Sequence, residues 1–365
     1  MNSTTLFTTT GPVLVIGAGL LGTSIALRLR SANVEVHVSD ASPVAAGLAR
    51  DLGAGSTDPV DDPQLVVVAV PPDVTAQVVR MALERYPHAV VTDVASVKHT
   101  IAADLAGDPH ISRWVGSHPM AGKERSGGIA ADADLFVGRP WVIVSDEKTD
   151  QKAVLCVRNL AADMGAAVMS MSAAEHDHAV AVMSHVPQLM SSLVGASLRD
   201  EPAQALDLAG QGLRDVTRIA HSDPLLWTSI IDGNRAEIAA ALRGIEQNLH
   251  ALITAIESEG GLDAISGIIH EGNLGVARIP GKHGGAPAHY CEVTVLVPDE
   301  PGRLGQLFSD IGAIGVNIED FSLEHSMAQP VGRAGVFVQP ARAAELEHGL
   351  DERGWQVVST EREGE

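Results

Sequence analysis

Residues 13–22 read Val13-Leu-Val-Ile-Gly-Ala-Gly-Leu-Leu-Gly22, an apolar run that ends in three glycines spaced G-x-G-x-x-G. The run Val13–Gly17 predicts a buried strand, and the apolar spacing of Leu20–Leu29 predicts a helix that begins directly after the turn. This strand–turn–helix order is the context in which the glycine pattern indicates a dinucleotide-binding fold.

Each residue of the turn has a physical task in such a fold. Gly17 makes the tight turn, Gly19 lets the backbone approach a pyrophosphate, and Gly22 lets the helix pack closely on the strand. The first helical residues, Leu20 and Leu21, offer free N–H groups to the phosphates. A glycine-rich turn without a ligand is the alternative.

A carboxylate follows at the position where a ribose is bound. Asp40 comes directly after the next predicted strand, Val34–Ser39, eighteen residues beyond Gly22. It can accept hydrogen bonds from ribose hydroxyls and repels a 2′-phosphate, so NAD is favoured over NADP as the cofactor. An ordinary turn carboxylate is the alternative. Val70 and Pro71 end the third strand beside the expected cofactor, where a proline turn that only ends the strand explains them equally well.

The same alternation of strands and helices continues to about residue 170 and predicts a parallel sheet covered on both faces. The other strands expected are 65–70, 89–93, 114–117 and 141–144. We therefore expect a Rossmann-type α/β domain over residues 1–171.

An all-helical domain is predicted over residues 172–282. Ser172-Ala-Ala-Glu175 reads as a capping box that opens a long helix, and Pro187 should kink that helix by freeing the carbonyl of Met183. A later helix carries a heptad-like apolar stripe, which suits packing against another helix within the chain or in a second subunit. The stripe consists of Ile238, Leu242, Ile245, Leu249, Leu252 and Ile256.

The C-terminal part follows a linker, Gly281–Pro287, and is predicted to be a third domain over residues 288–365. Its pattern predicts the order βαββαβ, with strands at 290–297, 316–324, 335–339 and 355–359 and helices at 302–314 and 341–353. This is the order of a small ferredoxin-like domain.

The composition excludes several classes of partner. Twenty-five Lys and Arg against 46 Asp and Glu give a formal net charge of −21, which disfavours nucleic acid and anionic membranes. We find no apolar stretch of membrane-spanning length. Two distant cysteines, Cys156 and Cys291, make no disulfide framework, so we expect a cytoplasmic protein.

Two side chains at the predicted ligand edge of the sheet suit the chemistry of a dehydrogenase. Ser96 follows the strand that ends near Asp93, and His118 follows the strand that ends at Ser117. A neutral histidine can accept a hydroxyl proton while hydride leaves the same carbon. From position alone, a surface turn residue before Pro119 is an equally good reading of His118.

The motifs around these residues resemble those of the prephenate and arogenate dehydrogenase family. The matching segments, in order along about residues 12–283, are Asp93-Val-Ala-Ser-Val-Lys98, Gly116-Ser-His-Pro-Met-Ala-Gly-Lys-Glu-Arg-Ser-Gly127, Ser184-His-Val-Pro-Gln188 and Arg214-Asp-Val-Thr-Arg218 through Trp227. The resemblance implies hydride transfer to NAD⁺ from a cyclohexadienol, followed by loss of CO₂.

The resemblance also implies roles for individual residues. His118 would accept the proton of the substrate hydroxyl, Ser96 would hydrogen-bond to the same group, and Arg218 would pair with the ring carboxylate. Without the family, a surface ion pair of Arg218 with Asp215 would be the preferred reading. The substrate pocket is expected to include Glu124, His185, Gln188 and Trp227.

One residue departs from the family pattern. Gln188 stands where a second histidine is usual, and glutamine cannot carry charge. We expect prephenate as the substrate, with arogenate or a 4-amino-4-deoxyprephenate relative as alternatives.

Four adjacent polar residues, Glu175, His176, Asp177 and His178, could suggest a metal site. Adjacent ligands at a helix start rarely converge on one ion, so we expect no metal. A solvated first helical turn is the better reading, although His176 and Asp177 also match the family pattern and could border the cleft.

The C-terminal segment resembles the ACT domain, a regulatory amino-acid-binding module, through Val297-Pro-Asp-Glu-Pro-Gly-Arg-Leu-Gly305 and Gly315-Val-Asn-Ile318. The resemblance implies Gly305 and Asn317 as effector contacts, with tyrosine as the effector. A purely structural or dimerising domain is the alternative.

Two other functions stay open from the sequence. One is a generic β-hydroxyacid dehydrogenase with the same two-domain plan, against which the paired His118 and Arg218 motifs argue. The other is a catalytically silent amino-acid sensor that keeps NAD binding. We expect the protein to be a homodimer.

Overall fold

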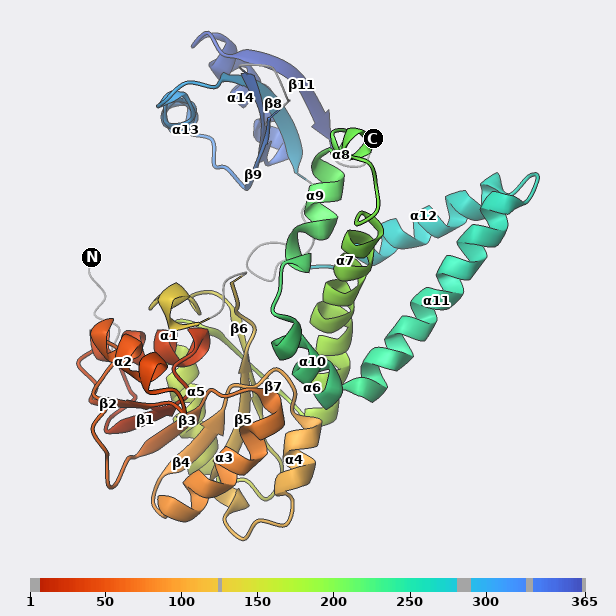
Figure 1. Cartoon of the computed structure of the whole chain (residues 1–365). Coiled ribbons are helices and arrows are strands. Elements are labelled where there is room, and N and C mark those ends of the chain that lie inside the picture. The colour runs from red at the N-terminus through yellow and green to blue at the C-terminus, as the bar shows by residue number, and fades with distance from the viewer. Residues whose placement is uncertain (1–6, 124–126, 281–289, 326–330, 363–365) are drawn as a thin grey trace. The chain divides into compact units, whose positions relative to one another are not determined.

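The computed structural model describes residues 7–123, 127–280, 290–325 and 331–362. The chain divides into two compact units, Met1–Gln247 and Asn248–Glu365 (Figure 1). Each unit is described by itself.

The first unit is built on a seven-stranded sheet of order β2-β1-β3-β4-β5-β6-β7. Its strands are β1 Val13–Ile16, β2 Val36–Ser39, β3 Leu65–Val68, β4 Val90–Asp93, β5 Trp114–Pro119, β6 Pro140–Val144 and β7 Ala167–Met171. Strands β1 to β5 are all parallel, which confirms the predicted Rossmann-type sheet. Strand β6 is antiparallel to β5, and the edge strand β7 was not predicted, because its sequence, Ala167-Val-Met-Ser-Met171, carries little β-branched signal.

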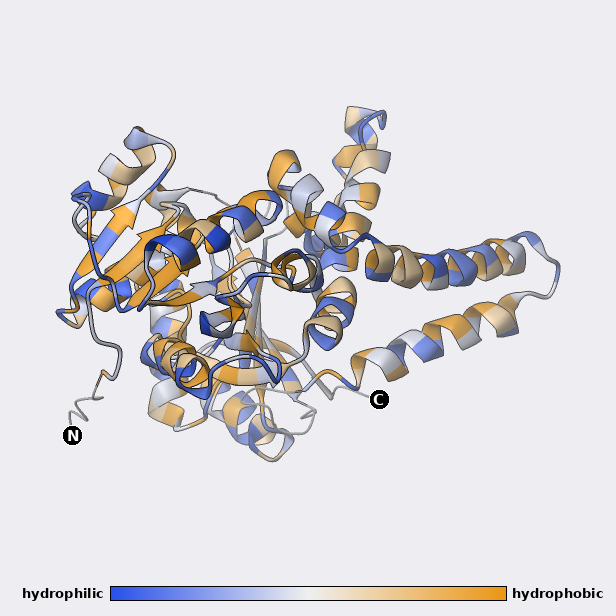
Figure 2. Cartoon of the chain, turned by 90° about the horizontal axis from the view of Figure 1, so that it is seen from below, coloured by the Kyte–Doolittle hydropathy of each residue, from blue (hydrophilic) through white to orange (hydrophobic). Residues whose placement is uncertain are grey.

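Alternate residues of these strands enter two separate cores. On one face Val13 and Val15 pack with helices α1 Leu20–Ser31, α2 Pro43–Asp51 and α5 Gln151–Asp163. On the other face Leu14 packs with α3 Pro72–Arg85, α4 His99–Leu105 and α10 Pro224–Gly233. Apolar colouring is accordingly dense on the strands (Figure 2). Burial of both faces explains why the strands read as continuous apolar runs.

The long helix after the sheet begins as predicted. The Ser172 side chain accepts a hydrogen bond from the backbone N–H of Glu175, whose carboxylate accepts one from the N–H of Ser172, which completes the capping box. The helix runs as α6 Ala173–Val180, a π-helical turn η3 Ala181–His185, and α7 Val186–Ser197. The disturbance expected from Pro187 is this π turn, which lies directly before it, since a proline cannot supply the N–H of a regular turn.

The helix over Ala173–Ser197 is, in the part of the chain that the structure describes, the one helix long and apolar enough by length and composition to cross a membrane. It carries the buried polar side chains of His176, Asp177 and His185. Buried, hydrogen-bonded polar groups of this kind favour a core helix of a folded domain over a membrane span.

The remaining helices of the first unit are short until α11 Arg235–Glu257, whose residues after Gln247 belong to the second unit. They are α8 Ala203–Leu206, α9 Gln211–Thr217 and the 3₁₀ turn η4 Arg218–Ala220, followed by α10. Ile238, at the start of the predicted stripe on α11, is buried with Ala181 and Val186, and Leu242 and Ile245 pack against this cluster. Further along the stripe, Leu249 and Ile256 are exposed.

The second unit contains helix α12 Leu262–Val276 and a four-stranded antiparallel sheet of order β11-β8-β10-β9. Its elements follow as β8 Cys291–Pro298, α13 Arg303–Ile314, β9 Asp320–His325, β10 Val331–Val338, α14 Ala343–Asp351 and β11 Gln356–Arg362. The predicted βαββαβ order is confirmed. One face of the sheet packs on α13 and α14 through an aliphatic core that includes Val293, Val295, Leu307, Ile311 and Leu346.

Candidate functional site

The glycine turn between β1 and α1 has the geometry that a dinucleotide needs. Gly17 has φ = +109°, and a Cβ there would collide with the backbone carbonyl of Ala69. A Cβ on Gly22 would collide with the carbonyl oxygen of Gly17, whereas a Cβ on Gly19 would meet nothing within 4 Å. The first and third glycines are therefore required by the fold itself, and the second leaves open space above the backbone.

The N-terminus of the helix that follows this turn can bind an anion. Gly19 is the N-cap of α1 and offers no side chain to the first helical N–H groups, those of Leu20 and Leu21. These N–H groups, at the positive end of the helix dipole, suit a pyrophosphate.

Asp40 lies where the cofactor ribose is expected. Its carboxylate accepts hydrogen bonds of 2.7 Å from the backbone N–H groups of Ala18 and Ser42, which ties the end of β2 to the glycine turn. Each oxygen keeps a lone pair for a ribose hydroxyl. Val70 lies beside the same turn, since its Cγ1 would be 3.3 Å from a Cβ placed on Gly17, and Pro71 is the N-cap of α3.

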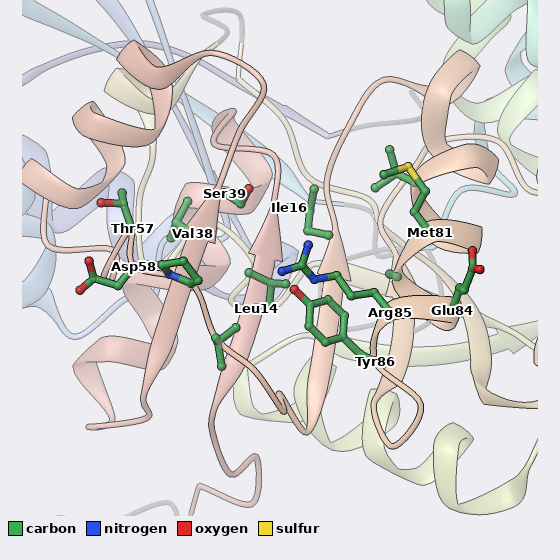
Figure 3. A pocket seen from close by; sticks show the side chains of 14 residues that line it. Leu14, Ile16, Val38, Ser39, Thr57, Asp58, Met81, Glu84, Arg85 and Tyr86 are labelled. Carbon is green, nitrogen blue, oxygen red and sulfur yellow. The ribbon is translucent and has the colours of Figure 1, made fainter.

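A groove of about 640 Å³ runs over the sheet face beside these strands (Figure 3). Leu14, Ile16 and Val38 line it, with Met81 and Tyr86 from the α3 side. Ser39, at the end of β2 next to Asp40, also lines it, so the groove adjoins the expected ribose position. Its mostly apolar walls suit contact with a flat ring rather than acid–base chemistry.

The reactive side chains lie further along the same edge of the sheet. Asp93 of β4 pairs in register with Gly116 of β5, so Ser96 and His118 both lie just beyond this pair at the carboxyl ends of adjacent strands. The two residues thus lie at the same edge of the sheet, and their meeting on one substrate hydroxyl stays a prediction. Ligands of open α/β sheets bind at this edge.

A buried ion pair holds the loop that carries Ser96. Lys98 and Asp93 are both fully buried, and the Lys98 Nζ donates to the Asp93 carboxylate and, at 3.1 Å, to the carbonyl of Val97. The Asp93 carboxylate also accepts hydrogen bonds of 3.1 Å from the Trp114 indole and from the N–H of Ala95. Removing one partner of such a pair leaves an uncompensated buried charge, at a cost of about 3–5 kcal/mol.

His118 is hydrogen-bonded to a second histidine. Its Nδ1 lies 2.8 Å from Nε2 of His176, and Nδ1 of His176 lies 2.7 Å from Oδ1 of Asp177. Burial, with the nearby positive charge of Lys98, holds the pKa of His118 well below its usual 6.5. The imidazole of His118 is therefore neutral at pH 7, as a proton acceptor must be.

A third histidine is also buried in this region. Asn234 donates from Nδ2 to the backbone carbonyl of Asp177 at 2.7 Å, and the same amide nitrogen lies 3.3 Å from Nδ1 of His185. Burial lowers the pKa of His185 to about 4, so it too is neutral. Its Nε2 is buried and has no hydrogen-bond partner among the described residues, and its ring packs edge-on against Trp227 with the ring centroids 6.2 Å apart.

The other predicted pocket residues lie on α7 and on the segment that follows it. Gln188 is buried, and its amide donates to the Ser222 hydroxyl at 2.8 Å. Arg218 is exposed at the start of η4, which packs against α7. Glu124 lies outside the described residues.

The candidate metal cluster does not form around one point. Glu175 caps the helix, His176 and Asp177 turn into the core, and His178 is exposed with Nδ1 2.9 Å from Glu237. Among the residues that the structure describes, no three His, Cys, Asp or Glu side chains are grouped to hold a metal ion.

The hydrogen bonds of His176, Asp177 and Asn234 near His118 and His185 were not predicted from the sequence. The residues Glu175 to His178 predicted a solvated first helical turn. In the structure, His176 and Asp177 are buried where α6 packs against the sheet. This turn is buried because His176 contacts His118, which lies 58 residues earlier in the chain. No local sequence pattern encodes such a long-range contact.

The fold and this edge of the sheet define a Rossmann-type dehydrogenase that uses NAD. Two family descriptions match consecutive parts of the chain: "Prephenate dehydrogenase, nucleotide-binding domain" over residues 24–170 and "Prephenate dehydrogenase, dimerization domain" over residues 172–266. The chain belongs to the prephenate dehydrogenase family.

Individual relatives agree with this assignment. The chain is 33% identical to a probable prephenate dehydrogenase, NovF, of Streptomyces niveus, over 94% of this chain and 99% of the relative. It is 30% identical to the prephenate dehydrogenase of Bacillus subtilis, over 85% of this chain and 87% of that protein.

A solved structure of similar fold carries the cofactor. The prephenate dehydrogenase of A. aeolicus, in complex with hydroxyphenyl propionate and NAD⁺, matches with a TM-score of 0.64 and 28% identity, over 74% of this chain and 99% of that chain. Synechocystis arogenate dehydrogenase matches with a TM-score of 0.60 and 26% identity, over 72% of this chain and 98% of that chain.

Proposed function

We propose that this chain oxidises prephenate with NAD⁺ and releases CO₂, forming 4-hydroxyphenylpyruvate for tyrosine biosynthesis in the cytoplasm. The observation that carries the proposal is a neutral, buried His118 at the carboxyl edge of the sheet, in a chain that matches both domains of the family. The resemblance of the motifs around Ser96, His118 and Arg218 supports the same reaction.

The residues of the first unit fit NAD. Gly17, Gly19 and Gly22, with the N–H groups of Leu20 and Leu21, would receive the pyrophosphate, and Asp40 would receive the ribose hydroxyls. Val70 lies beside the same turn, and Pro71 follows it as the N-cap of α3. Bound NAD⁺ supplies the acceptor for the hydride that leaves C4 of the substrate ring.

His118 moves the proton in this scheme. Its Nδ1 is bonded to His176, so Nε2 is the ring nitrogen left to accept the proton of the C4 hydroxyl. Breaking the bond between the ring and its carboxylate releases CO₂ and makes the ring aromatic. Prephenate and NAD⁺ yield 4-hydroxyphenylpyruvate, CO₂ and NADH without a net proton, so His118 returns its proton to the product oxygen.

Other side chains would hold the substrate. Ser96 would hydrogen-bond to the C4 hydroxyl, and Arg218 would pair with the ring carboxylate through two parallel N–H···O bonds. His185, Trp227, Gln188 and Glu124 would line the pocket. Gln188 carries no charge, and its amide nitrogen already donates to Ser222, which leaves its side-chain carbonyl oxygen to accept a hydrogen bond in the pocket.

The test is NADH formation with prephenate, with arogenate and with 4-amino-4-deoxyprephenate, each with NAD⁺ and then NADP⁺. The proposal predicts the largest kcat/KM for prephenate with NAD⁺, and a decrease in kcat of roughly 10²–10⁴-fold in His118→Ala, with the affinity for NAD unchanged. Preference for either alternative substrate would revise the specificity. Turnover of simple hydroxy acids, or NAD binding without any turnover, would replace the proposal with the dehydrogenase or sensor alternative.

We also propose that the chain is a homodimer whose interface includes α11 and α12. Leu249 and Ile256 on α11, and Leu262 and Ile269 on α12, are exposed apolar side chains. The match to a family dimerization domain over residues 172–266 supports this.

For the C-terminal ferredoxin-like unit, we propose an ACT domain that binds tyrosine. Gly305 lies in the first turn of α13 with open space around its Cα, and Asn317, in the loop before β9, donates to Glu319 at 2.9 Å. Tyrosine should lower the rate and raise the melting temperature of the wild type but not of Asn317→Ala. No effect of tyrosine on either quantity in the wild type would refute the effector.

A further inference from the structure

We propose that His176 and Asp177 are positioning residues that hold His118 in the tautomer whose Nε2 carries no proton. The inference rests on the proposed function for its catalytic meaning, because Nε2 of His118 is the atom that would accept the substrate proton. The tautomer itself follows from the hydrogen bonds when His176 is the neutral imidazole.

The chain of hydrogen bonds is fixed at Asp177. Its Oδ1 accepts from the backbone N–H of Lys98 at 2.8 Å, and its Oδ2 accepts from the N–H of His99 at 2.8 Å. Burial acts to raise the pKa of Asp177, but its hydrogen bonds to His176, His99 and Lys98 outweigh burial and keep the pKa below the usual value. Asp177 is therefore an ionised carboxylate, which can only accept hydrogen bonds.

The proton positions of both histidines follow from this acceptor. Oδ1 of Asp177 lies 2.7 Å from Nδ1 of His176, so this nitrogen carries the proton. In this proposal His176 is the neutral imidazole, whose one proton is then on Nδ1, so that its Nε2 is bare and accepts. Nδ1 of His118, 2.8 Å away, is then the donor, and Nε2 of His118 is left with a free lone pair.

Burial keeps this arrangement from rearranging. His176 is fully enclosed, and the two rings meet edge to face with centroids 5.1 Å apart. A second proton on the pair would place a buried cation among Lys98, His185 and the other histidine, the groups that face His118 from the β4–α4 loop, η3 and α6. Desolvation makes such a buried cation costly in the enzyme without substrate.

The arrangement also links two segments of the first unit. His118 lies on β5 of the sheet, and His176 and Asp177 lie on α6. Asp177 in turn holds the backbone at the start of α4, directly after the loop that carries Ser96. The acceptor atom is thus prepared only when α6 is docked on the sheet.

The experiment compares two substitutions of His176. In His176→Gln, the side-chain carbonyl oxygen can accept the Nδ1–H of His118. In His176→Leu, the volume is filled but no acceptor is present. We expect kcat in His176→Leu to fall at least about tenfold, and at most the roughly 10²–10⁴-fold that positioned proton transfer contributes, whereas His176→Gln keeps most of it. KM for NAD should not change in either variant. His178→Asn, an exposed histidine on the same helix, is the matched control and should keep wild-type kcat.

A second readout does not depend on turnover. In protein labelled with ¹⁵N-histidine, the ring signals of His118, assigned by their loss in His118→Asn, should show a protonated Nδ1 and a bare Nε2. A protonated Nε2 in the wild type, or equal kcat in His176→Leu and His176→Gln, would overturn the inference. Absence of prephenate turnover in the wild type would refute the proposed function, and the ¹⁵N measurement would still decide the tautomer.

Discussion

The glycine turn allows a prediction that separates binding from folding. Gly19→Ala and Gly22→Ala add the same methyl group, three residues apart. The Cβ on Gly19 meets nothing within 4 Å, and the backbone there, with φ = −78° and ψ = −166°, is open to alanine. The Cβ on Gly22 collides with the carbonyl of Gly17 and lies 3.1 Å from the Cβ of Ala69.

The two variants should therefore fail in different ways. Overpacking at Gly22 should destabilise the unit by about 1–3 kcal/mol, or roughly 2–4 °C of melting temperature per kcal/mol. At Gly19 the methyl group would occupy the approach of the pyrophosphate. Losing one charge-assisted hydrogen bond costs about 1.5–3 kcal/mol, which is roughly a 10- to 150-fold weaker affinity for NAD.

The assays are thermal melting without NAD and titration calorimetry with NAD. Gly19→Ala should melt like the wild type but bind NAD weakly, whereas Gly22→Ala should melt at a lower temperature. If Gly19→Ala lost stability and kept its affinity for NAD, the assignment of this turn to the pyrophosphate would be refuted.

The remaining predictions concern charge and assembly. Asp40→Asn should weaken NAD binding roughly 10- to 150-fold and reduce the preference over NADP, as measured by KM for each cofactor. Because the pKa of His118 is held well below 6.5, kcat/KM for prephenate should stay level from pH 8 to 6.5 and fall only at more acidic pH; a half-maximal value near pH 7 would contradict this. The pKa of His185 is about 4 in the folded protein, so the unfolded chain binds a proton at this residue more readily. The stability that the neutral His185 contributes is complete above pH 6.5 and is lost as the pH falls towards 4. The melting temperature of His185→Gln should therefore fall less between pH 7 and pH 5 than that of the wild type. Leu249→Asp combined with Ile256→Asp should turn the proposed dimer into a monomer in analytical ultracentrifugation, and an unchanged sedimentation coefficient would exclude this interface.

The sequence predicted the sheet well because its strands are buried on both faces. Runs such as Val13–Ile16 and Leu65–Val68 are apolar throughout, and each is followed by a helix with its own apolar face. The edge strand β7 was missed because an edge strand that is partly exposed needs no such run. The opposite direction of β6 was also missed, because direction depends on the path of the connecting chain rather than on strand composition.

The site residues that could be predicted from the sequence are those at the ends of predicted strands. The glycine turn and Asp40 each follow a strand, His118 lies near the carboxyl end of β5, and parallel strands bring these ends to one edge. The partners of His118 were not predictable in this way. His176 and Asp177 stand in a polar first turn whose local pattern is that of a solvated capping box, and Ser172 and Glu175 do form that box.

The difference lies in which side of one helical turn faces the sheet. Residues 175 and 178 are three apart and share the exposed side of α6, whereas 176 and 177 point inward and are buried. An apolar pair at these inward positions would be the ordinary choice for packing, since burying polar groups costs free energy unless every one is hydrogen-bonded. Here Asp177 accepts from two backbone N–H groups and one imidazole, and His176 is bonded on both ring nitrogens. Every polar group of His176 and Asp177 is thus hydrogen-bonded, and one of these bonds is to His118. Orientation of His118 as the proton acceptor explains this buried pair better than the packing of α6 does.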